Sequence, residues 1–189
     1  MPVHTVLLDA SVLYPAPLRD FLMHLALTDV VRVKWSAQIH QEWIEAVLRV
    51  RPDIARNQLE RTRTLMDSHI LDALVENYEH RIDELWLPDE DDRHVLAAAI
   101  EGGCDLIITF NLRDFPDDIL APLGISAQHP DLFCGNLIES SPLAVVAAAF
   151  EHRQSLKRPP KGVEEYLAAL ERQGLPKTAA RLREYAPLL

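Results

Sequence analysis

The sequence predicts an α/β fold with three layers, in which a central, mostly parallel sheet is flanked by helices and a helical extension follows at the C-terminus. Two short apolar runs, VHTVLL at 3–8 and DLIITF at 105–110, have the composition of buried strands. Segments with helical spacing of apolar residues lie between the predicted strands. Strands that alternate with helices form parallel sheets through right-handed crossovers. Beyond Pro130 only helical patterns follow.

The elements of the first half follow from local patterns. The strand at 3–8 ends at Asp9, and Ser11 is placed to cap the helix that continues through LRDFLMHLAL. The alternating segment VVRVKW predicts a second strand at 30–35, after which Ser36 opens a helix with apolar residues at helical spacing. A polar helix at 53–68 and a further helix at 70–80 complete this half. We expect Trp35, Trp43 and Trp86 in the core.

In the second half, an extended segment at 86–88 precedes a helix that starts at Asp91 or Asp92 and stops at Gly102. The strand at 105–110 and a short last strand at 124–127 come next. The final predicted helices span 131–140, 142–156, 163–173 and 176–184. We therefore expect a domain over residues 1–129 and a helical C-terminal extension over residues 130–189.

Composition narrows the class of function. The chain has 189 residues with 19 Lys and Arg against 29 Asp and Glu, a net charge of -10 that argues against binding nucleic acid merely by being basic. No apolar run reaches the roughly 18 residues of a membrane span, the N-terminal segment lacks the pattern of a signal peptide, and two cysteines exclude a disulfide framework. We expect a cytoplasmic protein. No GxGxxG or GxxxxGK[ST] motif supports nucleotide binding.

Positive charge is concentrated in two zones. Residues 151–189 contain 8 basic and 5 acidic residues, and the segment 49–63 contains five arginines against two acids. An acidic body with two basic zones suits a carboxylate site beside a surface that meets phosphates. Solvated helix faces would give the same pattern.

Carboxylates collect where the predicted strands end. Asp9 ends the first strand, Asp114 follows the strand DLIITF, and the acidic run DEDD at 89–92 precedes a helix. Glu42 lies at the edge of an apolar helix face. Ligands bind beyond the carboxyl ends of parallel strands, and acids gathered there repel one another unless a cation lies among them. Oxygen ligands favour Mg²⁺ or Mn²⁺, which activate water toward a phosphodiester. A metal-dependent nuclease is predicted, although Asp91 and Asp92 could instead be helix N-terminal acids.

Three motifs resemble the PIN domain, the ribonuclease fold of VapC-type toxins. They are VLLDASVL, QEWIEAVL and the long segment DEDDRHVLAAAIEGGCDLIITFNLRDFP. The long segment is the most specific, because it combines a D-R-x-x-h-A-x-A helix, a strand and a T-x-N-x-x-D-F turn. The resemblance covers about residues 3–128.

The resemblance implies a set of site residues. The catalytic and metal-binding acids would be Asp9, Glu42, Asp92 and Asp114, and the supporting hydrogen-bonding residues would be Ser11, Thr109 and Asn111. Two alternatives stay open at this stage: Glu45 in place of Glu42, and Asp89 or Asp91 in place of Asp92. Arg93 and Arg113 flank the acids and would either hold substrate phosphates or pair with those acids.

The resemblance also implies a function. Such a protein would be an endoribonuclease in which a water bound to Mg²⁺ or Mn²⁺ attacks RNA in line and leaves a 5′-phosphate and a 3′-hydroxyl. It would act as a homodimeric toxin that a cognate antitoxin neutralises. The competing hypothesis is a PIN fold that binds RNA or protein without turnover, and a DNA nuclease is weaker. The C-terminal helices would serve RNA docking, dimer packing, antitoxin binding or structural cover.

Overall fold

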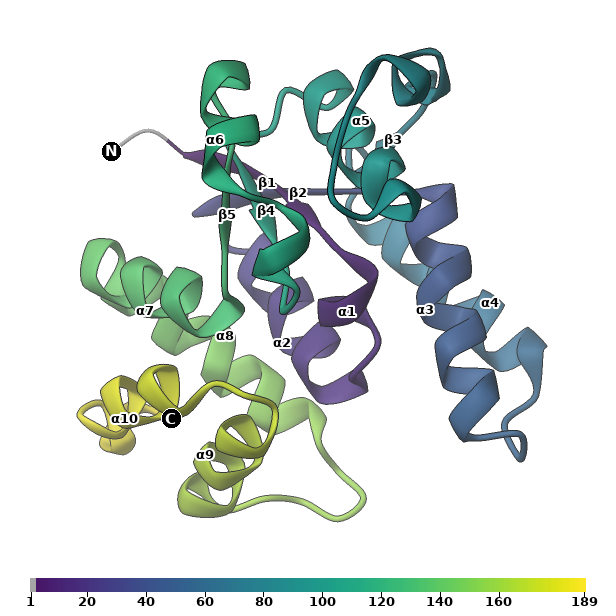
Figure 1. Cartoon of the computed structure of the whole chain (residues 1–189). Coiled ribbons are helices and arrows are strands. Elements are labelled where there is room, and N and C mark those ends of the chain that lie inside the picture. The colour runs from purple at the N-terminus through teal and green to yellow at the C-terminus, as the bar shows by residue number, and fades with distance from the viewer. Residues whose placement is uncertain (1–2) are drawn as a thin grey trace. The chain divides into compact units, whose positions relative to one another are not determined.

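The computed structural model describes residues 3–189, and their contacts divide the chain into two compact units (Figure 1). The sheet unit comprises residues 4–14 and 32–128. The helical unit contains residues 15–31 and 129–189. Each unit is described by itself.

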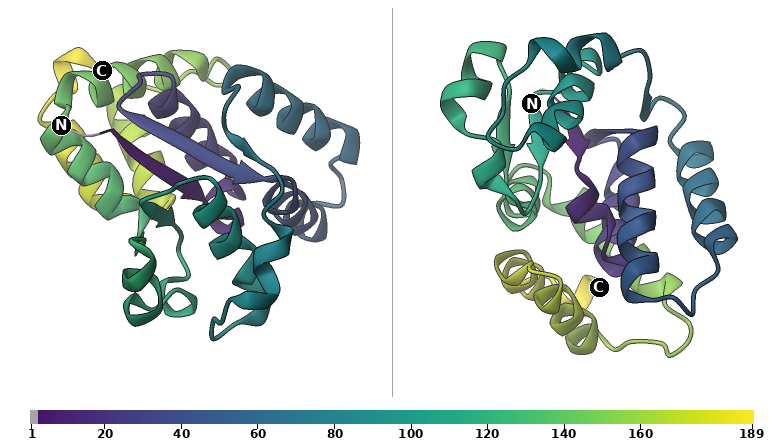
Figure 2. Two further views of the ribbon diagram at one scale, coloured as in Figure 1. Left: turned by 90° about the horizontal axis from the view of Figure 1, so that it is seen from above. Right: turned by 45° about the vertical axis from the view of Figure 1, so that its right-hand side comes forward.

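A five-stranded parallel sheet with the order β3-β2-β1-β4-β5 forms the centre of the sheet unit. The view from above shows β1 and β2 side by side (Figure 2, left). The strands are β1 (His4–Leu8), β2 (Val31–Ser36), β3 (Leu74–Val75), β4 (Leu106–Ile108) and β5 (Ser126–Gln128).

The apolar runs become the central strands because both faces of the sheet are buried. Leu7 pairs with Ile107 and Leu8 with Ile108, and all four side chains are fully buried. Pairing continues one residue beyond β1, where the N–H of Asp9 donates to the carbonyl of Ile108 at 3.1 Å. The residues that follow β1 and β4 are therefore held next to each other.

Helices connect these strands. Ser36 caps α3 by accepting a hydrogen bond from the N–H of Ile39 at 3.2 Å, as its position before the apolar pattern predicts. Helix α5 packs on β1 and β4, and its residues from Val95 to Ala99 are fully buried. The α-helices of this unit are α1 (Ala10–Leu13), α3 (Ala37–Val50), α4 (Arg56–His69), α5 (Arg93–Glu101) and α6 (Asp117–Leu120). Its 3-10 helices are η1 (Glu79–Glu84), η2 (Glu90–Asp92), η3 (Leu112–Asp114) and η4 (Ala121–Leu123).

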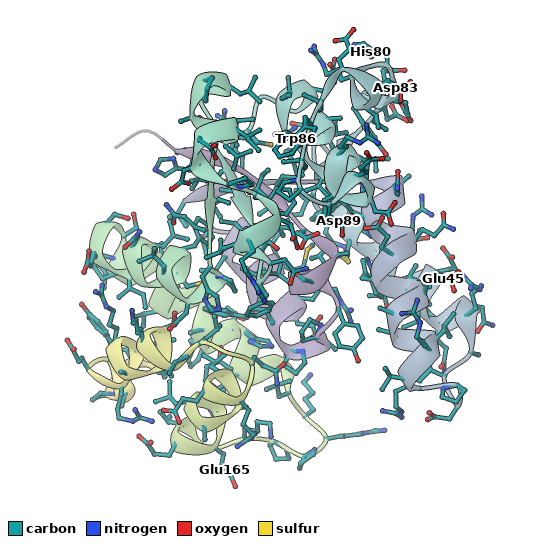
Figure 3. All side chains as sticks on the ribbon, viewed as in Figure 1. Glu45, His80, Asp83, Trp86, Asp89 and Glu165 are labelled. Carbon is teal, nitrogen blue, oxygen red and sulfur yellow. The ribbon has the colours of Figure 1, made fainter. Side chains whose placement is uncertain are left out.

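Three local predictions were wrong. The helix predicted at 70–80 is replaced by the two-residue strand β3 and the start of η1, because pairing with β2 overrides local helical spacing. Ser11 lies inside α1, whose N-cap is Asp9, and its hydroxyl bonds to side chains instead of capping the helix. Trp86, labelled in Figure 3, is 68% exposed, whereas Trp35 and Trp43 are buried as expected. The α/β class with a parallel sheet and a helical C-terminal part is confirmed.

The helical unit joins one early helix to the C-terminal ones. Helix α2 packs on α8 and α9, and α10 packs on α7 and α9. The helices are α2 (Ala16–Ala26), α7 (Pro130–Ser140), α8 (Pro142–Ser155), α9 (Val163–Arg172) and α10 (Pro176–Arg183), followed by the 3-10 turn η5 (Ala186–Leu188). The last four α-helices match their predicted ranges to within a residue or two. The division of the chain at residue 130 stays a prediction.

Among residues 3–189, no helix is both long enough and apolar enough to span a membrane.

Candidate functional site

The candidate site begins with Asp9, the residue that follows β1. Its side chain is only 5% exposed, and its backbone is fixed by the hydrogen bond to Ile108. An aspartate is rarely buried to this degree without partners, because removing a charge from water is unfavourable. Its contacts therefore show how the fold holds a charge at the carboxyl end of the sheet.

Two hydroxyl groups hold one oxygen of Asp9. Ser11 Oγ donates to Asp9 Oδ2 at 2.6 Å, and Thr109 Oγ1 donates to the same oxygen at 2.7 Å. These hydroxyls accept in turn from the backbone N–H groups of Phe110 (3.2 Å to Ser11) and Asn111 (2.9 Å to Thr109). The second oxygen, Oδ1, has no hydrogen-bond partner among the described residues. The carboxylate is thus fixed through one oxygen and offers the other.

Asp92 shows the electrostatic effect of the other acids. It is the residue before α5, and its pKa is raised to about 7, mainly by burial and in addition by the neighbouring charges of Asp9, Asp114 and Asp89. A carboxyl group that titrates near neutrality among other carboxylates is typical of sites that bind a cation or exchange a proton. The structure therefore brings together three of the predicted acids, namely Asp9, Asp92 and Asp114.

The acidic run before α5 contains side chains with different tasks. Asp89 Oδ1 accepts the N–H of Asp91 at 2.9 Å and so caps η2 (Figure 3). Asp91 is exposed, whereas Asp92 is half-buried and makes no capping hydrogen bond. Asp114 ends η3 and is also half-buried. Within this run, capping occupies Asp89, whereas Asp92 makes no capping bond and lies near Asp9 and Asp114.

The two candidate glutamates of α3 have different partners. Glu42 Oε1 lies 2.7 Å from Nε2 of the buried His94 and accepts from Gln38 at 3.3 Å. The contact with His94 is close, but it lacks the alignment of a hydrogen bond. Glu45, labelled in Figure 3, pairs with Arg56 of α4 at 2.6 Å. Glu42 is thereby linked to the helix that Asp92 precedes, whereas Glu45 is linked to α4.

The remaining predicted residues lie at the rim. Arg93 forms an ion pair with Glu90 at 2.8 Å, and Glu90 is not one of the candidate acids. Arg113 is exposed in η3, next to Asp114. Asn111 is exposed, and its backbone supports Thr109. The arginines are thus placed near the acids without neutralising them.

An open hollow of about 1140 Å³ runs along α3. Ser11 and Glu42 line it together with Tyr14, and Arg49 lies further along α3. Of the candidate acids, Glu42 borders this hollow, which offers room for a ligand beside that glutamate.

The donor set fits a hard divalent cation in its chemistry. Carboxylate oxygens of Asp9, Asp92 and Asp114 are the ligands that Mg²⁺ and Mn²⁺ prefer, and their mutual repulsion at Asp92 is what a cation would relieve. Among the described residues, however, no three acidic, histidine or cysteine side chains already converge at liganding distance. A metal-binding arrangement would require the carboxylates to rotate toward one another.

Sequence reasoning did not identify the contact between His94 and Glu42. The His94 side chain is buried in the structure. The missing information was the rotation of α3 relative to α5, which no local pattern reports. The one available signal was the position of His94 two residues after Asp92 on the same helix start.

Comparisons with known proteins identify two regions of the chain. The model of the PIN domain family matches residues 5–113, which is more than half of the chain. The model described as the VapC50 C-terminal domain matches residues 130–184.

A curated relative is the Mycobacterium tuberculosis protein named "Putative ribonuclease VapC50", which is 38% identical over 96 residues. The aligned part covers 51% of this chain and 56% of the relative, so the chain spans only about half of that protein's length in the match. No solved structure matches the chain.

Proposed function

Since the chain belongs to the PIN domain family, we propose that it is a metal-dependent endoribonuclease with Asp9, Glu42, Asp92 and Asp114 as its catalytic acids. The observation that carries the proposal is the placement of three acids by the fold: Asp9 follows β1, Asp114 lies in the segment after β4, and both are close enough to Asp92, before α5, for their charges to raise its pKa. Structural carboxylates are usually satisfied by donors, whereas Asp9 and Asp114 lie close enough to Asp92 for their charges to raise its pKa, at the carboxyl end of a parallel sheet.

The protein's own groups have distinct roles in this proposal. Ser11 and Thr109 fix one oxygen of Asp9 and leave Oδ1 for ligation. Asp92 and Asp114 bring their carboxylates from α5 and η3, and Glu42 adds one from α3, where His94 limits its rotation. Bound Mg²⁺ or Mn²⁺ would supply positive charge that lowers the pKa of water and stabilises the charge developing on the phosphodiester.

In-line attack of water on the phosphorus breaks the bond to the 3′-oxygen. The expected products are a 5′-phosphate and a 3′-hydroxyl.

RNA is proposed over DNA because the matched relative is named as a ribonuclease. The same relationship supports a VapC-type toxin that acts in the cytoplasm as a homodimer and is neutralised by an antitoxin. Two matches together support the VapC-type assignment: the PIN domain over residues 5–113 and the VapC50 C-terminal domain over residues 130–184.

The central test is cleavage of total RNA by purified protein with Mg²⁺, with Mn²⁺ and with EDTA, beside Asp9→Asn. We expect discrete products that carry a 5′-phosphate, disappear in EDTA and fall at least about 100-fold in Asp9→Asn. Asp118→Asn, the same substitution at an exposed position of α6, is the matched control and should cleave as the wild type does. Folded wild type that binds RNA but yields no metal-dependent product would support the non-catalytic binding module instead.

A second comparison assigns the glutamate. Glu42→Gln should lower kcat by about 10-fold or more, whereas Glu45→Gln should leave kcat within about 2-fold, because Glu45 is already paired with Arg56. The reverse order would make Glu45 the acid. The same pair of assays with Asp92→Asn and Asp91→Asn tests the third acid.

A further inference from the structure

The loop between α8 and α9 carries three cations around one hollow. Lys157, Arg158 and Lys161 line a concavity of about 420 Å³ together with Ser155, Leu156 and Pro159. No acidic side chain is among the residues that line it. Figure 1 shows this loop as the long connection from α8 to α9 within the helical unit.

These three cations lack the ion pairs that two arginines of the same unit form with described residues. Arg181 pairs with Glu139 at 2.5 Å, and Arg183 pairs with Glu164 and Glu171 at 3.1 and 3.2 Å. By contrast, none of the three cations of the loop forms an ion pair with a described residue. Their positive charges are therefore left for a ligand.

The loop backbone is held in place. Arg153 donates to the carbonyl of Lys161 at 2.9 Å and to that of Leu189 at 3.3 Å, which anchors the far end of the loop. At the near end, Ser155 Oγ donates to the carbonyl of His152 at 2.7 Å. Lys157 and Pro160 form an isolated bridge, and two prolines restrict the backbone further. An ordered loop loses little backbone entropy when it binds a ligand.

We propose that the loop Ser155–Lys161 is an RNA-binding site that contacts the phosphodiester backbone through Lys157, Arg158 and Lys161. Lysine and arginine are the usual phosphate contacts in protein–nucleic acid complexes. Lysine is depleted in protein–protein interfaces, whose centres need aromatic or aliphatic anchors. The loop hollow offers three charges and no aromatic side chain.

The two units of the chain differ in net charge, which explains why a basic site outside the acidic unit would help RNA to bind. The sheet unit has 20 acidic and 10 basic residues, whereas the helical unit has 9 of each. A unit with this excess of negative charge repels a polyanion at long range. Part of the affinity for RNA would thus come from cations outside the acidic site. This inference rests on the proposed function, because it takes RNA as the substrate.

The test is binding of a fluorescein-labelled single-stranded oligoribonucleotide, followed by fluorescence anisotropy in EDTA over a range of KCl concentrations. Lys157→Ala/Arg158→Ala should weaken binding by about tenfold and make the salt dependence shallower. Each phosphate contact to a single strand contributes about 0.7 to the slope of log K against log salt, so two lost contacts lower it by about 1.4.

Two controls isolate the loop from general charge and from loop structure. Arg172→Ala/Lys177→Ala removes the same charge from exposed positions of the same unit and should bind within about twofold of the wild type. Lys157→Arg/Arg158→Lys keeps the charge and should also bind as the wild type does. Equal weakening in both alanine variants, or weakening in neither, would overturn the proposal.

Two further outcomes distinguish RNA from an acidic protein partner, and RNA binding from RNA cleavage. Unchanged RNA binding together with lost binding of poly-L-glutamate in Lys157→Ala/Arg158→Ala would assign the loop to an acidic protein partner and overturn the RNA proposal. Because EDTA removes any metal, the assay does not depend on cleavage. A wild type that binds RNA through the loop but never cleaves it would refute the proposed nuclease and leave this inference standing.

Discussion

Asp9 in the sheet unit and Asp131 in the helical unit are both aspartates with 5% exposure, yet their surroundings differ. Asp131 uses both oxygens: the N–H groups of Lys177 and Thr178 donate to them at 3.0 and 2.8 Å, and the Thr178 hydroxyl adds a bond at 2.8 Å. It caps the first turn of α10 from α7. Asp9 uses a single oxygen, bound by two hydroxyls. Burial alone therefore does not distinguish the two carboxylates, whereas the unused oxygen and the neighbouring acids set Asp9 apart from Asp131.

The largest expected effect separates these two aspartates by stability. Asp131→Ala should lower the free energy of unfolding by about 3 kcal/mol, because two backbone N–H groups and a hydroxyl lose a charged acceptor. Asp9→Ala should change it by about 1 kcal/mol or less, since Ser11 and Thr109 lie 3.2 Å apart and can bond to each other. Urea denaturation in EDTA, followed by circular dichroism, measures both. Equal losses would show that Asp9 is as structural as Asp131.

The next effect concerns His152 of α8, which bonds to the Tyr166 hydroxyl at 3.1 Å. Burial, with a smaller contribution from His24, lowers the pKa of His152 to about 4 from its ordinary value of 6.5. As the pH falls, His152 therefore binds a proton at a higher pH in the unfolded chain than in the folded protein. Stability is full above pH 6.5 and decreases as the pH falls to about 4, by about 2–3 kcal/mol.

His152→Gln should remove this loss, because glutamine can keep the bond to Tyr166 and does not titrate. His80→Gln, at an exposed position of the sheet unit, is the matched control. Denaturation curves at pH 7 and pH 4 provide the comparison, and a wild-type decline that persists unchanged in His152→Gln would place its origin elsewhere.

The smallest effect has the opposite sign and belongs to Asp92. Its pKa, raised from 3.8 to about 7, means that the folded state holds a proton that the unfolded state has released. Stability therefore falls as the pH rises through this range. In EDTA, Asp92→Asn should be more stable than the wild type at pH 8 by about 1–2 kcal/mol, a value reduced because water screens a half-buried group. At pH 4 the two should agree, and a difference of equal size at both pH values would contradict the electrostatic origin.

Most strands of the sheet could be predicted from the sequence, but only part of the candidate site could. The runs VHTVLL and DLIITF predict β1 and β4 because burial on both faces requires continuous apolar residues. β3 was missed because two residues, Leu74 and Val75, carry no pattern of their own and depend on pairing with β2. The proximity of Asp9, Asp92 and Asp114 follows from strand order, so it could be predicted. The contact of Glu42 with His94 depends on helix rotation, which is set by packing far away in sequence.

The hydrogen bond between Asp9 and Thr109 also has a consequence for the order of events during synthesis. The two residues lie 100 positions apart, and the hydroxyl that fixes the acid belongs to the segment after β4. The first acid leaves the ribosome early, but its partner emerges only after more than half of the chain has been translated. A nascent chain therefore carries no assembled carboxylate cluster through most of its translation.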